Sequence, residues 1–359
     1  MSDHEMTGFS LSPQQRAIRA LDREAGAPGC RTLAVVAVTG PCDEGRLSAA
    51  ALALAERHEI LRTRLVEGRA RPRRWSASRA SRGRQQDDWV GCSEAEQGER
   101  MSRLVARLSE DRGADDGLRV GLVRVGPEER RLVLAAPAWC VDEESIAPLV
   151  RELCASTAGA GAPPEQQYAD VAEWLNGMLE SEDAGDGRRF WAERRSHFGP
   201  PLHLAFSRGG AGAGAGSGRA RVDLQGGMAQ VERWSSSWQV PQRIVLLALW
   251  ASLLWRMSGG NEPEVTVAVR FDGRSLDALA GAVGPFARFL PVRIEISASD
   301  TLADVARRLA LAEAEAAAHQ DAAPGVSHRM SWGLLRRGGR AGAVARRRAG
   351  PRARRLEHV

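Results

Sequence analysis

The segment Leu132–Leu153 constrains the fold of this chain more than any other part of the sequence. It begins with the short apolar run Leu132–Ala136, which predicts a buried strand. A loop with Asp142 and Ser145 follows, and then a helix with apolar residues on one face, namely Ile146, Leu149, Val150 and Leu153. A strand that leads through a short loop into an amphipathic helix indicates a mixed α/β fold, and acyltransferases often place a base in such a loop.

The preceding sequence supplies neighbours for this strand. The run Arg119–Val125 alternates arginine or glycine with apolar residues, turns at Gly126–Glu128 and returns as Arg131–Ala136, which predicts an antiparallel hairpin. Three further elements are expected earlier in the chain: a helix at Pro13–Arg23, a strand at Thr32–Val38 and a helix at Glu44–His58. This mixture predicts an α/β sandwich, that is, an α+β arrangement of sheet and covering helices.

The second half of the chain shows a similar mixture. The expected elements are a helical stretch at Ala169–Arg195, a helix at Pro241–Met257, strands at Glu264–Val269 and Val292–Ile296, and a helix at Leu302–Ala318. The segment Val245–Trp255 is apolar on all sides, which predicts a helix buried in a core, and it is too short to span a membrane.

Length and composition favour two lobes. A chain of 359 residues that is 43% hydrophobic can bury a large core. We expect a first lobe at residues 1–165, a second lobe at 166–324 and an arginine-rich tail at 325–359. Three low-complexity or charged stretches are expected to be linkers or solvated loops: residues 69–84, 157–167 and 209–218.

The arginine-rich tail dominates the charge balance. The formal net charge of the chain is +5, but residues 325–359 hold ten arginines and one acid, so the first 324 residues carry −4. A mildly acidic folded part argues against nucleic acid as a partner. The tail is either a disordered basic segment able to touch RNA or acidic surfaces, or the product of out-of-frame translation of a GC-rich gene, and its composition favours the second.

Targeting signals and cysteine patterns are also informative. The sequence has no run of 18 or more apolar residues and no signal-peptide pattern, so we expect a cytoplasmic protein without a membrane partner. The cysteines are scattered and form no CxxC pair, which predicts buried reduced thiols and neither disulfides nor a metal site; they are Cys30, Cys42, Cys92, Cys140 and Cys154.

Six short segments around the central strand and loop resemble, in order and spacing, motifs of the condensation domains of nonribosomal peptide synthetases. They are FSLSPQQRA (Phe9–Ala17), RHEILRT (Arg57–Thr63), YADVAEW (Tyr168–Trp174), RRFWAERR (Arg188–Arg195), VGPFARFLPVR (Val283–Arg293) and AHQD (Ala318–Asp321). The resemblance implies two chloramphenicol-acetyltransferase-like lobes in a V arrangement. It also implies that the second lobe is incomplete at its C-terminal end, where the family continues with further strands and helices.

The family has the motif HHxxxDG in the loop after the central strand. Anchoring its aspartate on Asp142 places the two histidines at Pro137 and Ala138 and the glycine at Glu143. The resemblance therefore implies a degenerate site without the histidine that is tied to catalysis, and no residue is assigned as catalytic. Alanine can neither take a proton from an amine nor orient it, although a positioned base typically contributes about 10²- to 10⁴-fold in rate.

Structural roles at the site also follow from the resemblance. In the family, the motif aspartate forms an ion pair with the second arginine of RHExLRT, here Arg62, and a buried carboxylate needs such a partner. A structural pair is favoured over a catalytic one, and Ser145 belongs to the same scaffold.

Three residues are candidates to line the tunnel between the lobes that the family implies: Trp139, Cys140 and Arg288. Arg288 stands where the family has an asparagine. Cys140 is expected to be a packed thiol rather than a nucleophile.

These observations lead to one functional hypothesis and two alternatives. The first is a condensation-like domain that does not form peptide bonds itself and serves as an interface for an adenylation domain, a peptidyl carrier protein or a tailoring oxygenase such as a hydroxylase. It would work near the phosphopantetheine arms of carrier proteins and bind no cofactor or metal. The first alternative is an active condensation domain that joins a carrier-bound thioester to an amine by positioning alone. The second is an RNA-binding protein that uses the tail.

Overall fold

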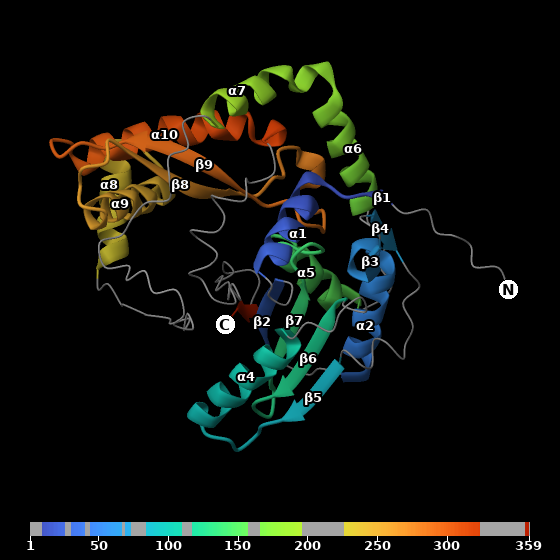
Figure 1. Ribbon diagram of the computed structural model, residues 1–359. Coiled ribbons are helices and arrows are strands. Elements are labelled where there is room, and N and C mark those ends of the chain that lie inside the picture. Colours follow the sequence, from blue (N-terminus) through green and yellow to red (C-terminus); the bar gives the residue numbers. More distant parts are fainter. Residues whose placement is uncertain are drawn as a thin grey trace. The chain divides into compact units, whose positions relative to one another are not determined.

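The computed structural model describes most of the chain as helices, strands and short connections (Figure 1). The described residues are 9–25, 30–39, 44–66, 69–72, 84–109, 117–156, 166–195, 226–323 and 356–358. Two compact units divide the chain, and neither is one continuous run of sequence. Unit 1 comprises residues 1–178, 274–287 and 340–359, and unit 2 comprises residues 179–273 and 288–339.

A five-stranded sheet forms the centre of unit 1, in the order β10-β2-β7-β6-β5. Its strands are β2 (Arg31–Thr39), β5 (Arg84–Asp88), β6 (Arg119–Arg124), β7 (Glu129–Pro137) and β10 (Leu356–His358). β6 and β7 are antiparallel neighbours joined by a short turn, so the predicted hairpin is confirmed. β2 pairs with the whole of β7 in the antiparallel sense, which brings the chain near residue 30 beside the end of β7.

Alternating side chains of this sheet enter two different cores. Leu33 of β2 and Val133 of β7 face a small core with α4 (Glu94–Ser109). Ala34 and Leu132, one residue along in each strand, face the larger core with α2 (Glu44–Arg57) and α5 (Ile146–Ser156). This alternation follows from the two-residue period of a strand and accounts for the continuous apolar runs in β2 and β7. α4 was not among the predicted helices.

The remaining elements of unit 1 surround the larger core. They are α1 (Pro13–Ala25), the 3-10 turn η1 (Glu59–Arg62), α6 (Tyr168–Glu180), the 3-10 turn η4 (Asp277–Leu279) and a small sheet β1-β4-β3 (Phe9–Ser10, Arg69–Pro72 and Thr63–Val66). β4 occupies the start of the segment 69–84, for which the sequence had predicted an irregular loop. That prediction is wrong for residues 69–72 and for Arg84, the first residue of β5, and residues 73–83 lie outside the described part of the chain.

Unit 2 consists of a two-stranded antiparallel sheet and its helices. The strands are β8 (Glu264–Phe271) and β9 (Arg288–Glu295), and the helical elements are η3 (Glu182–Ala184), α7 (Gly185–Arg195), α8 (Gly227–Trp238), α9 (Gln242–Met257), α10 (Leu302–Ala318) and η5 (Gln320–Ala322). One face of the strands packs on α9 and α10, with Val267, Leu290 and Val292 in the shared core. The predicted stretch Ala169–Arg195 is two helices, α6 and α7, separated by η3.

α9 differs from its prediction as a helix buried on all sides. Ile244, Val245 and Ala248 are fully buried, but Leu246 and Trp250 are about half exposed. A helix that is apolar all round is buried on all sides only if neighbours cover every face, and no described residue buries the face with Leu246 and Trp250.

Three other expectations fall on residues that the structure describes little or not at all. The linker 157–165 and the glycine-rich run 209–218 lie outside the described residues, and of the tail only β10 is described. None of the helices in the described part of the chain is long and apolar enough to cross a bilayer.

Candidate functional site

The loop between β7 and α5 is held by backbone hydrogen bonds at its start. The N–H groups of Cys140 and Val141 donate to the carbonyl oxygen of Pro137 at 2.8 and 3.2 Å. The N–H of Ala138 donates to the carbonyl oxygen of Cys30 at 2.8 Å, since β2 pairs with β7 and places residue 30 next to it. Position 138 is therefore fixed by the sheet.

Two side chains from other elements hold the rest of the loop. Gln15 of α1 is fully buried, and its Nε2 donates to the carbonyl oxygen of Trp139 at 3.2 Å. Thr32 of β2 donates from Oγ1 to the carbonyl oxygen of Val141 at 2.6 Å. The motif FSLSPQQRA thus contributes directly to the shape of the site loop through Gln15.

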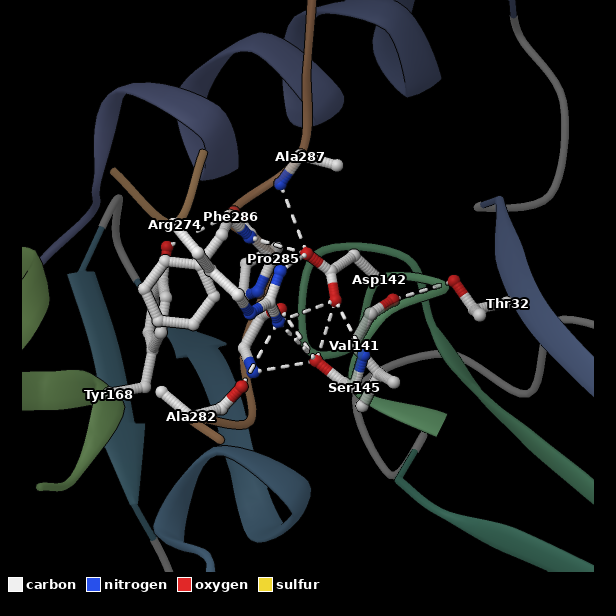
Figure 2. A network of polar contacts seen from close by, with 11 residues as sticks. Thr32, Val141, Asp142, Ser145, Tyr168, Arg274, Ala282, Pro285, Phe286 and Ala287 are labelled. Atoms are coloured by element: carbon white, nitrogen blue, oxygen red, sulfur yellow. Dashed lines mark hydrogen bonds and ion pairs between the residues drawn. The ribbon is translucent and has the colours of Figure 1, made fainter. Parts of the chain in front are cut away.

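Asp142 lies at the centre of a buried polar network (Figure 2). Its Oδ1 accepts hydrogen bonds from the N–H of Ser145 at 3.0 Å, from Ser145 Oγ at 2.6 Å and from Arg274 Nη2 at 2.9 Å. Its Oδ2 accepts from Arg274 Nη1 at 2.8 Å and from the N–H groups of Phe286 and Ala287, both at 3.0 Å. The guanidinium compensates the buried charge, and six donors surround the carboxylate.

Ser145 extends the network to the segment 274–287. Its Oγ accepts from the N–H of Gly284 and from Arg274 Nη2, each at 3.0 Å. The N–H of Asp142 donates to the carbonyl oxygen of Gly284 at 3.3 Å, and Arg274 Nη2 donates to the carbonyl oxygen of Ala282 at 3.0 Å. Asp142, Ser145 and Arg274 therefore fasten two segments that are about 130 residues apart in sequence.

The ion-pair partner of Asp142 is a correction to the sequence analysis. The expected partner, Arg62, ends η1, and the arginine bound to Asp142 is Arg274. The side chains of Asp142 and Arg274 are only 6% and 4% exposed. Charge and burial require a cation beside Asp142, but they do not say which of two arginines supplies it.

Aromatic side chains close one side of the network. The guanidinium of Arg274 lies over the ring of Phe286 at 4.4 Å, and this ring makes an edge-on contact with Tyr168 at 5.1 Å between centroids. The Tyr168 hydroxyl donates to Ser12 Oγ at 2.8 Å and lies 3.3 Å from the carbonyl oxygen of Pro285. The single tyrosine of the chain thus joins α6 to the start of α1 and to the segment 274–287.

Gly284 is required by this packing. A Cβ atom added there would lie 2.0 Å from Cδ2 of Tyr168, closer than any real contact. Because the Tyr168 ring is buried, it cannot move aside without disturbing its own partners.

Neither of the two histidine positions carries a group that can accept a proton, and the glycine position carries a carboxylate. Pro137 is buried, Ala138 is partly exposed and Glu143 is exposed. Among the histidines of unit 1 whose side chains the structure describes, His58 is the one present, and its Nε2 is hydrogen-bonded to Glu152 of α5 at 2.9 Å. No cluster of three His, Cys, Asp or Glu side chains suited to a metal ion occurs among the described residues.

The three tunnel candidates are placed as follows. Cys140 is fully buried, and Trp139 is partly buried against the same core. Arg288 of unit 2 is buried; its Nη1 donates to the carbonyl oxygen of Gln320, and its Nη2 lies 3.1 Å from Asp321 Oδ1. This contact joins β9 to the AHQD segment, and a tunnel-lining role for these residues stays a prediction.

The pair His58–Glu152 links η1 to α5 beside the site. Burial alone would raise the pKa of the Glu152 carboxyl, but the hydrogen bond from His58 and the surrounding positive charges, including Arg57 at 3.0 Å, lower it below its ordinary value. Glu152 is therefore ionised and paired at neutral pH.

The cysteines do not all follow the expectation of buried thiols. Cys140 is buried, Cys92 is partly exposed and Cys30 is exposed as a residue. Partial burial of the Cys30 thiol, together with the negative charge and hydrogen bond of Asp22, raises its pKa to about 11. Cys42 and the side chain of Cys154 lie outside the described part.

Comparisons with known proteins agree with this architecture. A family model described as "Condensation domain" matches residues 7–324. Phosphinothricin tripeptide synthetase PhsC of Streptomyces viridochromogenes is 27% identical over 325 residues, which are 87% of this chain and 30% of that protein. The isonitrile lipopeptide synthase of Mycobacterium tuberculosis is 29% identical, over 82% of this chain and 12% of that protein. The chain thus spans less than a third of the length of these relatives.

Solved structures give the same result for the fold. SgcC5 of Streptomyces globisporus aligns with a TM-score of 0.72 at 25% identity, over 90% of this chain and 77% of that one. The first condensation domain of the calcium-dependent antibiotic synthetase aligns with a TM-score of 0.70 at 18% identity, over 88% and 76%. The expected chloramphenicol-acetyltransferase-like fold class is confirmed, and the chain belongs to the condensation-domain family of nonribosomal peptide synthetases.

Proposed function

We propose that this chain is a binding and recruitment domain of a nonribosomal peptide synthetase that does not itself form peptide bonds. The observation that carries the proposal is the side chain at position 138. The family motif, anchored on Asp142, puts its second histidine there, and this chain has a methyl group. A methyl group cannot accept a proton, so general-base assistance from this position is absent.

Two neighbouring groups, Asp142 and Cys140, do not replace the histidine. Both oxygens of Asp142 are occupied by protein donors, and its charge is neutralised by Arg274. A base needs a free lone pair within hydrogen-bond reach of the amine. Cys140 is fully buried and packed in the larger core of unit 1, so its sulfur is shielded from solvent.

A retained scaffold with lost chemistry fits a role in binding. The network around Asp142 keeps the loop and the segment 274–287 in one shape, which a binding surface needs as much as a catalyst does. Solved structures of the same fold include the X-domain from teicoplanin biosynthesis, at 23% identity and a TM-score of 0.69, and a complex of that X-domain with OxyB. The partners we propose for this chain are a peptidyl carrier protein with its phosphopantetheine arm, an adenylation domain and a tailoring oxygenase.

Product analysis by mass spectrometry tests the proposal. The chain is mixed with a donor-loaded and an amine-loaded carrier protein, alongside a Pro137→His/Ala138→His variant, and the carriers are examined for amide. We expect no amide from the parent chain and retained binding of an adenylation–carrier pair in calorimetry. Amide from the parent would overturn the proposal in favour of an active condensation domain that works by positioning. Absence of both amide and carrier binding would overturn recruitment.

The double histidine variant serves as a matched control. Amide from this variant alone would show that substrates reach the site and that the side chains at 137 and 138 limit the chemistry, which supports the proposal.

A further inference from the structure

Three large apolar side chains are exposed in a row on α9. Leu246, Trp250 and Leu253 are 46%, 49% and 47% exposed, and their spacing of four and three residues puts them on one face of the helix. We refer to Leu246, Trp250 and Leu253 as the α9 stripe. Single exposed apolar residues are ordinary, but a contiguous row of this kind indicates an interaction surface.

The opposite face of α9 fixes the direction of the stripe. Ile244, Val245, Ala248, Ala251 and Trp255 are buried in the core of unit 2. A rotation that hid the stripe would expose these five residues, so the stripe stays on the surface. It spans two helical turns, about 10 Å along the axis.

Charged residues of α9 lie before and after the stripe. α9 contains no acidic residue, and its only charged residues are Arg243 and Arg256, three residues before and three residues after the stripe. The Arg243 side chain is 59% exposed and paired with Glu313 of α10, and Arg256 is exposed. The Arg243–Glu313 pair is neutral overall, so the net positive charge on α9 beside the stripe is that of Arg256.

We propose that the α9 stripe is the docking site for an amphipathic helix of a partner protein, with an apolar stripe of matching spacing and acidic residues near the end that meets Arg256. Helices pack when side-chain rows at four- and three-residue spacing interlock. A helix that binds in this way presents apolar anchor residues at positions i, i+4 and i+7. An acidic residue at that end of the partner helix would meet Arg256, while Arg243 keeps its partner Glu313.

Two other occupants fit less well. A second copy of α9 in the parallel sense would bring Arg256 against Arg256, and like charges in contact oppose association. An anionic membrane would favour tryptophan, leucine and arginine, but membrane-surface helices bury a wide apolar face, and here most apolar residues of α9 are already in the core.

This inference goes beyond recruitment at the site in unit 1, because the α9 stripe belongs to unit 2. Amide formation and carrier binding are measured separately from helix binding, so either proposal can fail alone.

The test uses the full chain and a fluorescein-labelled 15-residue peptide with leucines at positions 4, 8 and 11 and glutamates at both ends. Binding is followed by fluorescence anisotropy, next to a peptide of the same composition with the leucines dispersed and one with lysines at its ends. We expect the parent chain to bind the first peptide at least tenfold more tightly than either control peptide. Trp250→Ala should weaken that binding at least tenfold, as is usual for a central aromatic anchor.

Leu311→Ala is the matched control variant, because Leu311 of α10 is 69% exposed and lies outside the stripe. Its binding should equal that of the parent, and thermal unfolding should show that both variants are folded. Equal binding of all three peptides, or no effect of Trp250→Ala, would overturn the proposal. A concentration-dependent dimer that Trp250→Ala abolishes would also overturn the proposal. Binding to phosphatidylglycerol vesicles that Trp250→Ala abolishes, without peptide binding, would overturn it as well.

Discussion

The ion pair between Asp142 and Arg274 predicts a strong energetic coupling that a double-mutant cycle can measure. Asp142→Asn and Arg274→Met keep the approximate size of each side chain and remove its charge. Breaking a buried ion pair by removing one partner costs about 3–5 kcal/mol, because the remaining charge is left uncompensated. Both side chains are more than 90% buried, so we expect each single variant to lose stability in this range.

The double variant should lose less than the sum of the two single losses, with a coupling energy of about 2–3 kcal/mol, since removal of the second charge relieves the first. Losses of this size approach the whole stability of a domain, which is typically about 5–15 kcal/mol. Urea unfolding is therefore followed by circular dichroism in the cold with sucrose added, which strengthens the folded state.

Arg62 provides the internal control. Arg62→Met combined with Asp142→Asn should give additive losses, with a coupling below about 0.5 kcal/mol, because the buried ion pair of Asp142 is made with Arg274. A coupling of Asp142 to Arg62 as large as its coupling to Arg274, or no coupling to Arg274, would refute the assignment of Arg274 as the partner.

Three further outcomes can be checked. Gly284→Ala should lower the free energy of unfolding by about 1–3 kcal/mol through overpacking, while Gly281→Ala, on the same segment with open space around it, should be near neutral in the same urea assay. The folded-state pKa of Glu152 is lowered, so its contribution to stability is complete above the ordinary carboxyl pKa of 4.5 and is lost as the pH falls through the lowered value. Glu152→Gln should therefore reduce the loss of stability on the acid side of a stability–pH curve. An unchanged loss of stability in acid would contradict the pairing. The raised pKa of Cys30 predicts slow alkylation of its thiol by iodoacetamide at pH 8. Asp22→Asn should lower that pKa and increase the alkylation rate roughly threefold or more. No change in the rate would argue against an influence of the Asp22 carboxylate.

Elements with strong local patterns were predictable from the sequence. The helix expected at Leu302–Ala318 is found with those bounds as α10, where Thr301 and Asp304 form a reciprocal cap. The hairpin before the site loop was also predicted correctly. In these cases the period of apolar residues and the turn residues carry the information, and both act within a few positions of the chain.

Features that depend on distant residues were not predictable. β5 has the polar sequence RQQDD, and it becomes a strand because β6 offers it a parallel edge. Arg274 stands 132 residues from Asp142, so no spacing rule connects them. α8 has apolar residues at a helical period, Val231 and Trp234 among them, and this signal could have revealed the helix. The exposure of one face of α9 was not predicted, because the apolar sequence of a helix does not say which other elements pack against it.

The path of residues 274–287 has a consequence for the exchange of parts between synthetases. These residues leave β8 and return to β9, both in unit 2, but they belong to unit 1 and carry the guanidinium that neutralises Asp142. A chimera with one junction near residue 178 would thus combine the aspartate of one parent with the arginine segment of another. We expect viable recombinants to inherit both segments from the same parent, and natural variants at Asp142 and Arg274 to change together.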